Sequence, residues 1–167
     1  ILNNKLFQNN IVDIQKALYP LGLLTDTRNV SKNRKIIQVQ FSIPNNEQSN
    51  LEELINLLIY NQFPILCSIK KLNNSKYYNN LSFHQNGWTV AVDFPYENFD
   101  NKSIRYFYRK LIEHQGKIYL AKDSTLNVDE FREMYPKFKE WEKVLKKLDP
   151  NNIYQSELSY RLGLKTW

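Results

Sequence analysis

Two residues suited to chemistry, Tyr119 and Lys122, lie close together in the segment Tyr-Leu-Ala-Lys-Asp-Ser, at the end of an apolar run. A lysine at the end of a strand is either an exposed surface residue or a fixed cation beside a developing negative charge. The spacing of these residues leaves both interpretations open. The sequence contains no glycine-rich phosphate loop, HExxH zinc-protease motif or GxSxG hydrolase motif.

A second set of polar residues follows the pattern of strands. Gln38 and Gln40 alternate with apolar residues in one run, and Lys70 lies in another. Strands usually expose Thr, Lys or Glu, so two glutamines beside a lysine are suited to binding hydroxyl groups. The alternative is a sheet face that simply contacts water.

The remaining reactive side chains predict no further chemistry. Cys67 is the only cysteine, and it falls on the apolar side of its run, so we expect it to be buried and unreactive. His84 lies in a polar connection. His114 lies near the end of a helix, where the helix dipole stabilises a positive charge. One cysteine excludes a cysteine-rich metal site, and we expect no bound metal.

Composition limits the protein to a few classes. The chain has 167 residues, 42% of them hydrophobic, so it can bury roughly 70% of its extended-chain surface in one domain or slightly more. The net charge of +6 suits an anionic partner without naming one. No apolar run approaches the ~20 residues of a membrane span.

The first residues indicate where the chain acts and whether it is complete. The sequence begins at Ile1 and shows neither a signal peptide nor a transit peptide, so we expect a cytoplasmic protein or one peripheral at the membrane. We also expect it to be a fragment of a longer protein.

Three runs with alternating apolar residues and a fourth, short run predict strands, and two segments with helical spacing lie between them. The predicted strands are residues 36–43, 64–71, 88–94 and 117–121. The order βαββαβ is typical of an α+β, ferredoxin-like fold, which has a four-stranded antiparallel sheet with both helices on one face.

Local signals set the ends of the two helices. Ser49, with Glu52 three residues later, has the spacing of a capping box and predicts the start of the first helix, which runs to about residue 61. The second helix is expected to run to about Gln115, with Gly116 as its cap.

The chain divides into three predicted parts. Residues 1–35 form a helical lead-in, with a helix within residues 10–24, and a mobile basic loop at residues 25–35. Residues 36–124 form the ferredoxin-like domain, and residues 125–167 form a helical tail with helices at 128–134 and 137–147. If the helices cover the apolar side of the sheet, the other face carries these residues: Gln38, Gln40, Lys70, Thr89, Ala91 and Asp93.

An ordered series of motifs resembles the carboxy-terminal part of FAD-linked oxidoreductases of the vanillyl-alcohol oxidase fold family, with the aldonolactone oxidases as more distant members. The resemblance covers about residues 36–164. The motifs are GWTVAVDFP at 87–95, GKIYLAKDS at 116–124, MYP at 134–136, Trp141, LDP at 148–150, Ser156 and RLGL at 161–164.

The resemblance implies a flavin-dependent oxidation of a sugar-type secondary alcohol by hydride transfer to FAD. The substrate would be a sugar or a polyprenyl-phospho-sugar. FAD would be bound mainly by a domain or subunit absent from this chain, and residues 125–167 would return to that domain. We therefore expect the chain alone to bind FAD weakly and to be inactive.

The resemblance also assigns roles to residues. Lys122 would be catalytic and would contact the cofactor, stabilising the negative charge of the reduced flavin, while Tyr119 would line the site. Gln38, Gln40 and Lys70 would hold the sugar hydroxyls or a phosphate.

Further roles concern the centre of the sheet and the basic loop. Thr89 and Ala91 would also contact substrate. Ala91 stands where the family relative has a cysteine, so covalent inhibition through that thiol is not expected. The basic loop would cover the substrate entrance, where it either meets a phosphate or is simply solvated. Its cationic residues are Arg28, Lys32 and Arg34.

Two rival interpretations remain. A ferredoxin-like sheet in a chain of pI about 9.3 could bind RNA, but an RNA-recognition domain places aromatic residues on its central strands. Here the predicted open face carries Gln, Lys, Thr and Ala, which disfavours nucleic acid as a partner. An interaction domain without catalysis is the other alternative, and the presence of Tyr119 and Lys122 argues against it.

Overall fold

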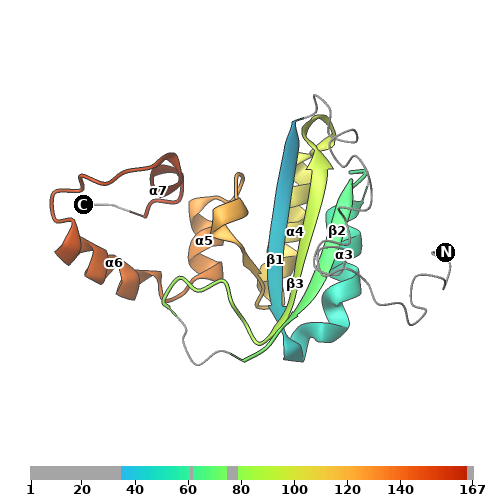
Figure 1. Ribbon diagram of the computed structural model, residues 1–167, viewed down its shortest axis with the longest axis horizontal. Coiled ribbons are helices and arrows are strands. Elements are labelled where there is room, and N and C mark those ends of the chain that lie inside the picture. Colours follow the sequence, from blue (N-terminus) through green and yellow to red (C-terminus); the bar gives the residue numbers. More distant parts are fainter. Residues whose placement is uncertain (1–34, 61, 75–78, 165–167) are drawn as a thin grey trace, which may run out of the picture. The chain divides into compact units, whose positions relative to one another are not determined.

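Two long antiparallel strands form the centre of the protein. The computed structural model describes residues 35–60, 62–74 and 79–164 (Figure 1). Strands β1 (Ile36–Pro44) and β3 (Gly87–Pro95) pair along their whole lengths, from Ile36 opposite Pro95 to Pro44 opposite Gly87. Both strands match their predicted positions, because strict alternation over this length fits only a strand with one buried face.

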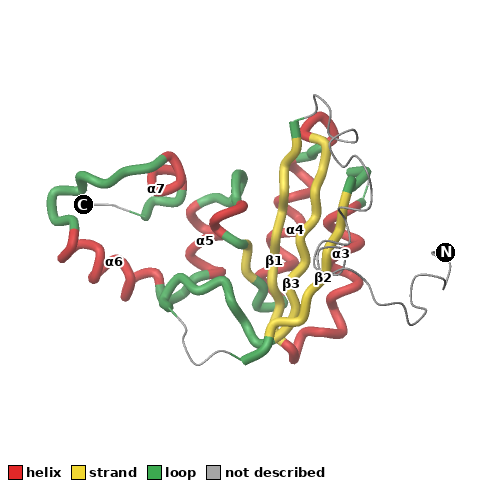
Figure 2. Tube along the Cα trace, in the orientation of Figure 1, coloured by secondary structure: helices red, strands yellow, loops and turns green. Residues whose placement is uncertain are grey.

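Two shorter strands complete the sheet, and two helices cover one of its faces. The order is β2–β3–β1–β4, with β2 at Leu66–Leu72 and β4 at Lys117–Ile118, and all pairs are antiparallel. Helices α3 (Leu51–Ile59) and α4 (Asn101–Glu113) lie on the same side of the strands (Figure 2). This arrangement confirms the predicted α+β, ferredoxin-like fold.

The core lies between the sheet and these helices. Phe41 of β1 meets Phe107 of α4 edge to face, with ring centroids 5.3 Å apart. The apolar rows of both central strands are buried against the helices, which explains why alternation of period two appears in β1 and β3. The buried residues of these rows are Ile37, Val39, Phe41, Ile43, Val90, Val92 and Phe94.

The predicted capping box at Ser49 is wrong. Residues Asn45–Asn50 form a 3-10 turn, and α3 begins at Leu51 with Asn50 as its N-terminal cap. The Asn50 amide donates a hydrogen bond to Glu47 Oε2 at 2.8 Å, and His114 Nδ1 lies 2.9 Å from the same oxygen. The chain therefore uses Glu47 to tie this turn to the end of α4, which sequence spacing alone does not show.

The cap of α4 also differs from the prediction. Gln115, with φ of 54°, takes the left-handed position, and the Gly116 amide donates to the Leu111 carbonyl at 2.8 Å. A Cβ at Gly116 would lie 2.1 Å from Leu111 Cδ1. The glycine is therefore needed for close packing rather than for a positive φ.

The fourth strand is shorter than predicted. Regular pairing with β1 ends at Ile118, opposite Phe41, although the Tyr119 amide still donates to the Gln40 carbonyl at 2.8 Å. A 3-10 turn, Leu120–Lys122, follows. The chain thus leaves the sheet edge just before Lys122.

The tail adds three helices to the same compact unit, Lys35–Trp167. The first, α5 (Val128–Met134), begins with a capping box made by Asn127 and Glu130, and α6 (Phe138–Leu148) follows as predicted. The sequence analysis did not predict α7 (Glu157–Arg161). Tyr135, just after α5, is buried and donates to the Ile118 carbonyl at 2.6 Å, so the start of the tail packs on its own sheet.

Two further expectations concern other parts of the chain. The predicted lead-in helix and almost all of the basic loop, including Arg28, Lys32 and Arg34, lie outside the described residues. Within the described ranges, no helix is long and apolar enough to cross a membrane.

Replacing Gly87 tests the pairing of β1 and β3 at one end. A Cβ at this position would lie 2.0 Å from the Ile43 carbonyl oxygen and 2.8 Å from Pro44 Cα, both backbone atoms that cannot rotate away. We expect Gly87→Ala to lower the free energy of unfolding by about 1–3 kcal/mol, measured by urea denaturation. The neighbouring exposed Asn86→Ala is the control, and equal stability of the two variants would contradict this packing.

Candidate functional site

The face of the sheet opposite the helices gathers the predicted site residues. Directly opposed residues in an antiparallel sheet point to the same face. The register places Gln38 opposite Asp93, Gln40 opposite Ala91, and Lys70 opposite Thr89. Apart from the residues at the strand ends, the outer face of the three strands comprises Gln38, Gln40, Ser42, Leu66, Ser68, Lys70, Thr89, Ala91 and Asp93.

A chain of hydrogen bonds fixes Lys122 at one end of this face. The Lys122 ammonium donates to Gln38 Oε1, and Gln38 Nε2 donates to Asp93 Oδ1. The two partners define which way the Gln38 amide points, because its oxygen faces a cation and its nitrogen faces a carboxylate. Lys122 itself is exposed, so its remaining N–H donors are available to a bound molecule.

Gln40 is held by a second chain of hydrogen bonds. Its Nε2 donates to Thr89 Oγ1 at 3.2 Å, and the Thr89 hydroxyl donates to the Phe41 carbonyl at 2.9 Å. Thr89 is buried, so in this structure it supports Gln40 from within the sheet. Among the described residues, none donates a hydrogen bond to the Gln40 amide oxygen.

A connection at residues 79–86 covers the other end of the face. The Ser42 hydroxyl donates to Gln85 Oε1 at 2.8 Å, and Lys117 Nζ donates to the Ser82 carbonyl at 3.0 Å. Phe83 stacks against Tyr119 with ring centroids 4.8 Å apart. Tyr119 therefore lies where the covered part of the face meets the open part.

The open part combines charge with a flat centre. Lys70 is exposed on the edge strand β2, and Lys122 is exposed beyond the opposite edge strand, β4. Cations therefore lie at both edges of the sheet. Between them, Gln40, Ala91 and Ser68 lie side by side across three strands. Because the Ala91 and Ser68 side chains are small, they protrude little from the sheet, and longer hydrogen-bonding side chains surround them.

The sequence analysis missed two contributors to this site. It placed Asp93 on the outer face but gave it no role, whereas Asp93 orients Gln38. Phe83 lies in a polar connection without periodicity, so no sequence signal points to its contact with Tyr119. Both contacts join residues that are far apart in the chain.

Cys67 corrects one prediction. The register places it on the apolar face, opposite Val92, as expected, but it is exposed rather than buried. It lies on the edge strand β2, where Ile69 on the same face is also 49% exposed. Partial burial raises the pKa of the Cys67 thiol.

The two histidines take part in local hydrogen bonds. His84 Nε2 lies 2.6 Å from the Asn73 carbonyl, and His114 contacts Glu47 at the end of α4. Among the residues that the structure describes, no three His, Cys, Asp or Glu side chains are grouped so that they could hold a metal ion.

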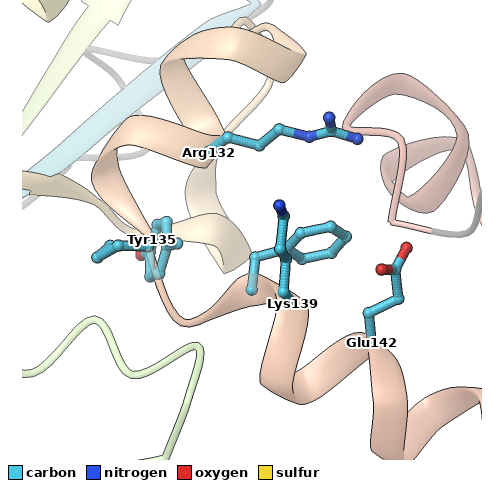
Figure 3. Close-up of a pocket in the computed structure, with 6 residues that line it drawn as sticks. Arg132, Tyr135, Lys139 and Glu142 are labelled. Carbon is cyan, nitrogen blue, oxygen red and sulfur yellow. The ribbon is translucent and has the colours of Figure 1, made fainter.

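A separate cavity lies between α5 and α6. Its volume is about 240 Å³, and its walls include Arg132, Tyr135, Lys139 and Glu142 (Figure 3). The Arg132 guanidinium lies 5.6 Å from the centre of the Phe138 ring, which also lines the cavity. It shares no residue with the outer face of the sheet, so we do not include it in the candidate site. Its lining residues are Arg132, Tyr135, Pro136, Phe138, Lys139 and Glu142.

Comparisons with known proteins agree with the resemblance seen in the motifs. A family model described as D-arabinono-1,4-lactone oxidase matches residues 32–162. The chain is also 25% identical over 158 residues to the decaprenylphosphoryl-beta-D-ribose oxidase of Mycolicibacterium smegmatis, a match that covers 95% of this chain and 34% of the relative. The chain therefore spans about a third of the length of this curated relative. Both matches confirm the predicted similarity to FAD-linked oxidases.

The exposure of Cys67 can be tested by thiol labelling. We expect one thiol per chain to react with Ellman's reagent in the native protein, more slowly at pH 7 than free cysteine does, because a raised pKa lowers the thiolate fraction. The rate should increase as the pH rises toward that pKa. Cys67→Ser is the control, and a thiol that reacts only after unfolding would show that the residue is buried.

Proposed function

Because the chain belongs to the D-arabinono-1,4-lactone oxidase family, we propose that the outer sheet face forms the substrate side of an FAD-linked oxidase. Its substrate would be a sugar or a polyprenyl-phospho-sugar with a secondary alcohol. The observation that supports this most directly is the contact between Lys122 and Gln38, which holds a cation at the edge of an open polar surface.

The residues of this face suit a flavin and a sugar. Bound FAD would accept the hydride from the alcohol carbon, and the protein would orient the reactants and stabilise charge. A shallow centre beside Ala91, with amide and ammonium groups around it, leaves room for a planar ring and offers donors for hydroxyls. Since the chain spans about a third of its relative, we place most FAD-binding residues in the rest of the protein.

Lys122 would act electrostatically. A positive charge fixed beside the place where negative charge develops lowers the barrier without reorganising during the reaction. Gln38 supports this role because its amide oxygen accepts from the Lys122 ammonium, while Asp93 prevents the amide from flipping. Tyr119, braced by Phe83, would line the same end of the site.

Three residues would bind the rest of the substrate. The amide oxygen of Gln40 would accept a hydrogen bond from a sugar hydroxyl, and the remaining Gln38 N–H would donate one. Lys70, on the opposite edge of the sheet, is placed to meet a phosphate or a further hydroxyl. Thr89 would contribute by holding the Gln40 side chain in place.

The tail would dock on the FAD-binding part. Several apolar side chains of α6, α7 and the segment between them are exposed, and exposed apolar areas often mark interaction sites. Leu148 is 76% exposed and Tyr160 is 90% exposed. The exposed residues of this region are Val144, Leu148, Ile153, Tyr154 and Tyr160.

The role of Lys122 can be tested in the complete, FAD-containing protein. We expect Lys122→Ala to slow anaerobic flavin reduction by substrate by about a hundredfold, because the fixed charge is lost. Stopped-flow absorbance of the flavin measures this rate, and the unfolding temperature should not change, since Lys122 is exposed. Lys102→Ala, an exposed lysine on α4, is the control.

Two results would contradict the proposal at different levels. Unchanged reduction by Lys122→Ala would remove this lysine from the reaction. A well-folded complete protein without flavin, or with flavin that no sugar alcohol bleaches, would refute the oxidase function itself, and RNA titration would then test the rival binding function.

A further inference from the structure

A buried carboxylate follows directly after Lys122. The Asp123 side chain is 0% exposed, and both of its oxygens are occupied. Oδ1 accepts from the amides of Thr125 and Leu126 at 2.9 and 2.8 Å, and Oδ2 accepts from Arg161 Nη2 at 2.8 Å. Such bonds define the path of the backbone just beyond the lysine.

Arg161, from a distant part of the chain, bonds to both ends of the turn formed by residues 123–126. Besides Asp123 Oδ2, its guanidinium donates to the Leu126 carbonyl. Arg161 is the last residue of α7, and the adjacent Leu162 is fully buried, so the backbone that carries the guanidinium is anchored to the core. A planar guanidinium with several N–H donors can make these bonds together, which a lysine cannot.

We propose that Arg161 is a positioning residue for Lys122, an inference that rests on the proposed function. Lys122 has a long, flexible side chain and an exposed ammonium, so its position depends on where its backbone is held. On one side, the Tyr119 amide is bonded to Gln40 of β1. On the carboxy-terminal side of Lys122, the bond between Asp123 and Arg161 holds the backbone.

The arrangement also links the tail to the site. Tyr160 precedes Arg161 and is 90% exposed on α7. A domain that docks on α7 would therefore contact the helix whose Arg161 holds the backbone just after Lys122. In the complete protein, the same helix would serve both docking and the placement of the lysine.

Two substitutions remove the Asp123–Arg161 ion pair from opposite sides. Arg161→Gln leaves a buried carboxylate without its cation, whereas Asp123→Asn keeps an oxygen acceptor for the Thr125 and Leu126 amides and removes the charge. In the complete FAD-containing protein, we expect both to speed hydrogen exchange of these two amides by about tenfold, because their turn opens more often. Arg109→Gln, an exposed arginine on α4, is the control.

The decisive measurement compares two backgrounds. We expect Arg161→Gln to slow anaerobic flavin reduction at saturating substrate by about tenfold or more, because small misplacements of a reacting group are costly. In the Lys122→Ala background, Arg161→Gln should cause no further loss. A general structural defect would slow both backgrounds equally.

Each outcome decides the inference. It is overturned if Arg161→Gln leaves the reduction rate of the otherwise native protein unchanged while Lys122→Ala lowers it, a result that leaves the proposed function intact. It is also overturned if Arg161→Gln slows the Lys122→Ala protein as much as the native one. If Lys122→Ala has no effect, the proposed role of Lys122 fails, and the inference fails with it.

Discussion

The full-length antiparallel pairing of β1 with β3 is the constraint on which the other features depend. It fixes a register of nine residue pairs, and a slip of one residue would exchange the buried row for the polar row. Phe41, packed against Phe107, and its apolar neighbours lock this register from the helical side. The polar row then lies on the other side, where residues 79–86 cover one end of it and the other end stays open.

A second constraint determines the edge of that surface. The fourth strand stops after two residues, so the chain turns away beside Gln38 and brings Lys122 to it. The buried Asp123 and the distant Arg161 hold the far side of the turn. The position of the Lys122 cation therefore depends on Gln38 of β1, Asp93 of β3 and Arg161 of the tail. A cation held in this way suits electrostatic stabilisation of a developing negative charge.

The same surface separates the oxidase proposal from its nucleic-acid-binding rival. RNA-binding sheets of this fold offer exposed aromatic rings on the central strands for base stacking. Here those strands offer Gln38, Gln40, Ala91 and Asp93, and Tyr119 is stacked on Phe83. Membership of the D-arabinono-1,4-lactone oxidase family agrees with the proposed role of this polar surface in binding a sugar-type substrate.

The sequence by itself determined the two central strands, the order of strands and helices along the chain, the face on which the glutamines lie and the family, because alternation and ordered motifs are local properties of the chain. It placed Cys67 on the correct face but not its exposure, and it misplaced the caps of α3 and α4. The exposure of Cys67 depends on its place in the sheet, and the contacts of Lys122 with Gln38 and of Asp123 with Arg161 depend on partners far away in the chain. Only the tertiary structure decides them, because burial and pairing between distant segments leave no periodic signal in the sequence.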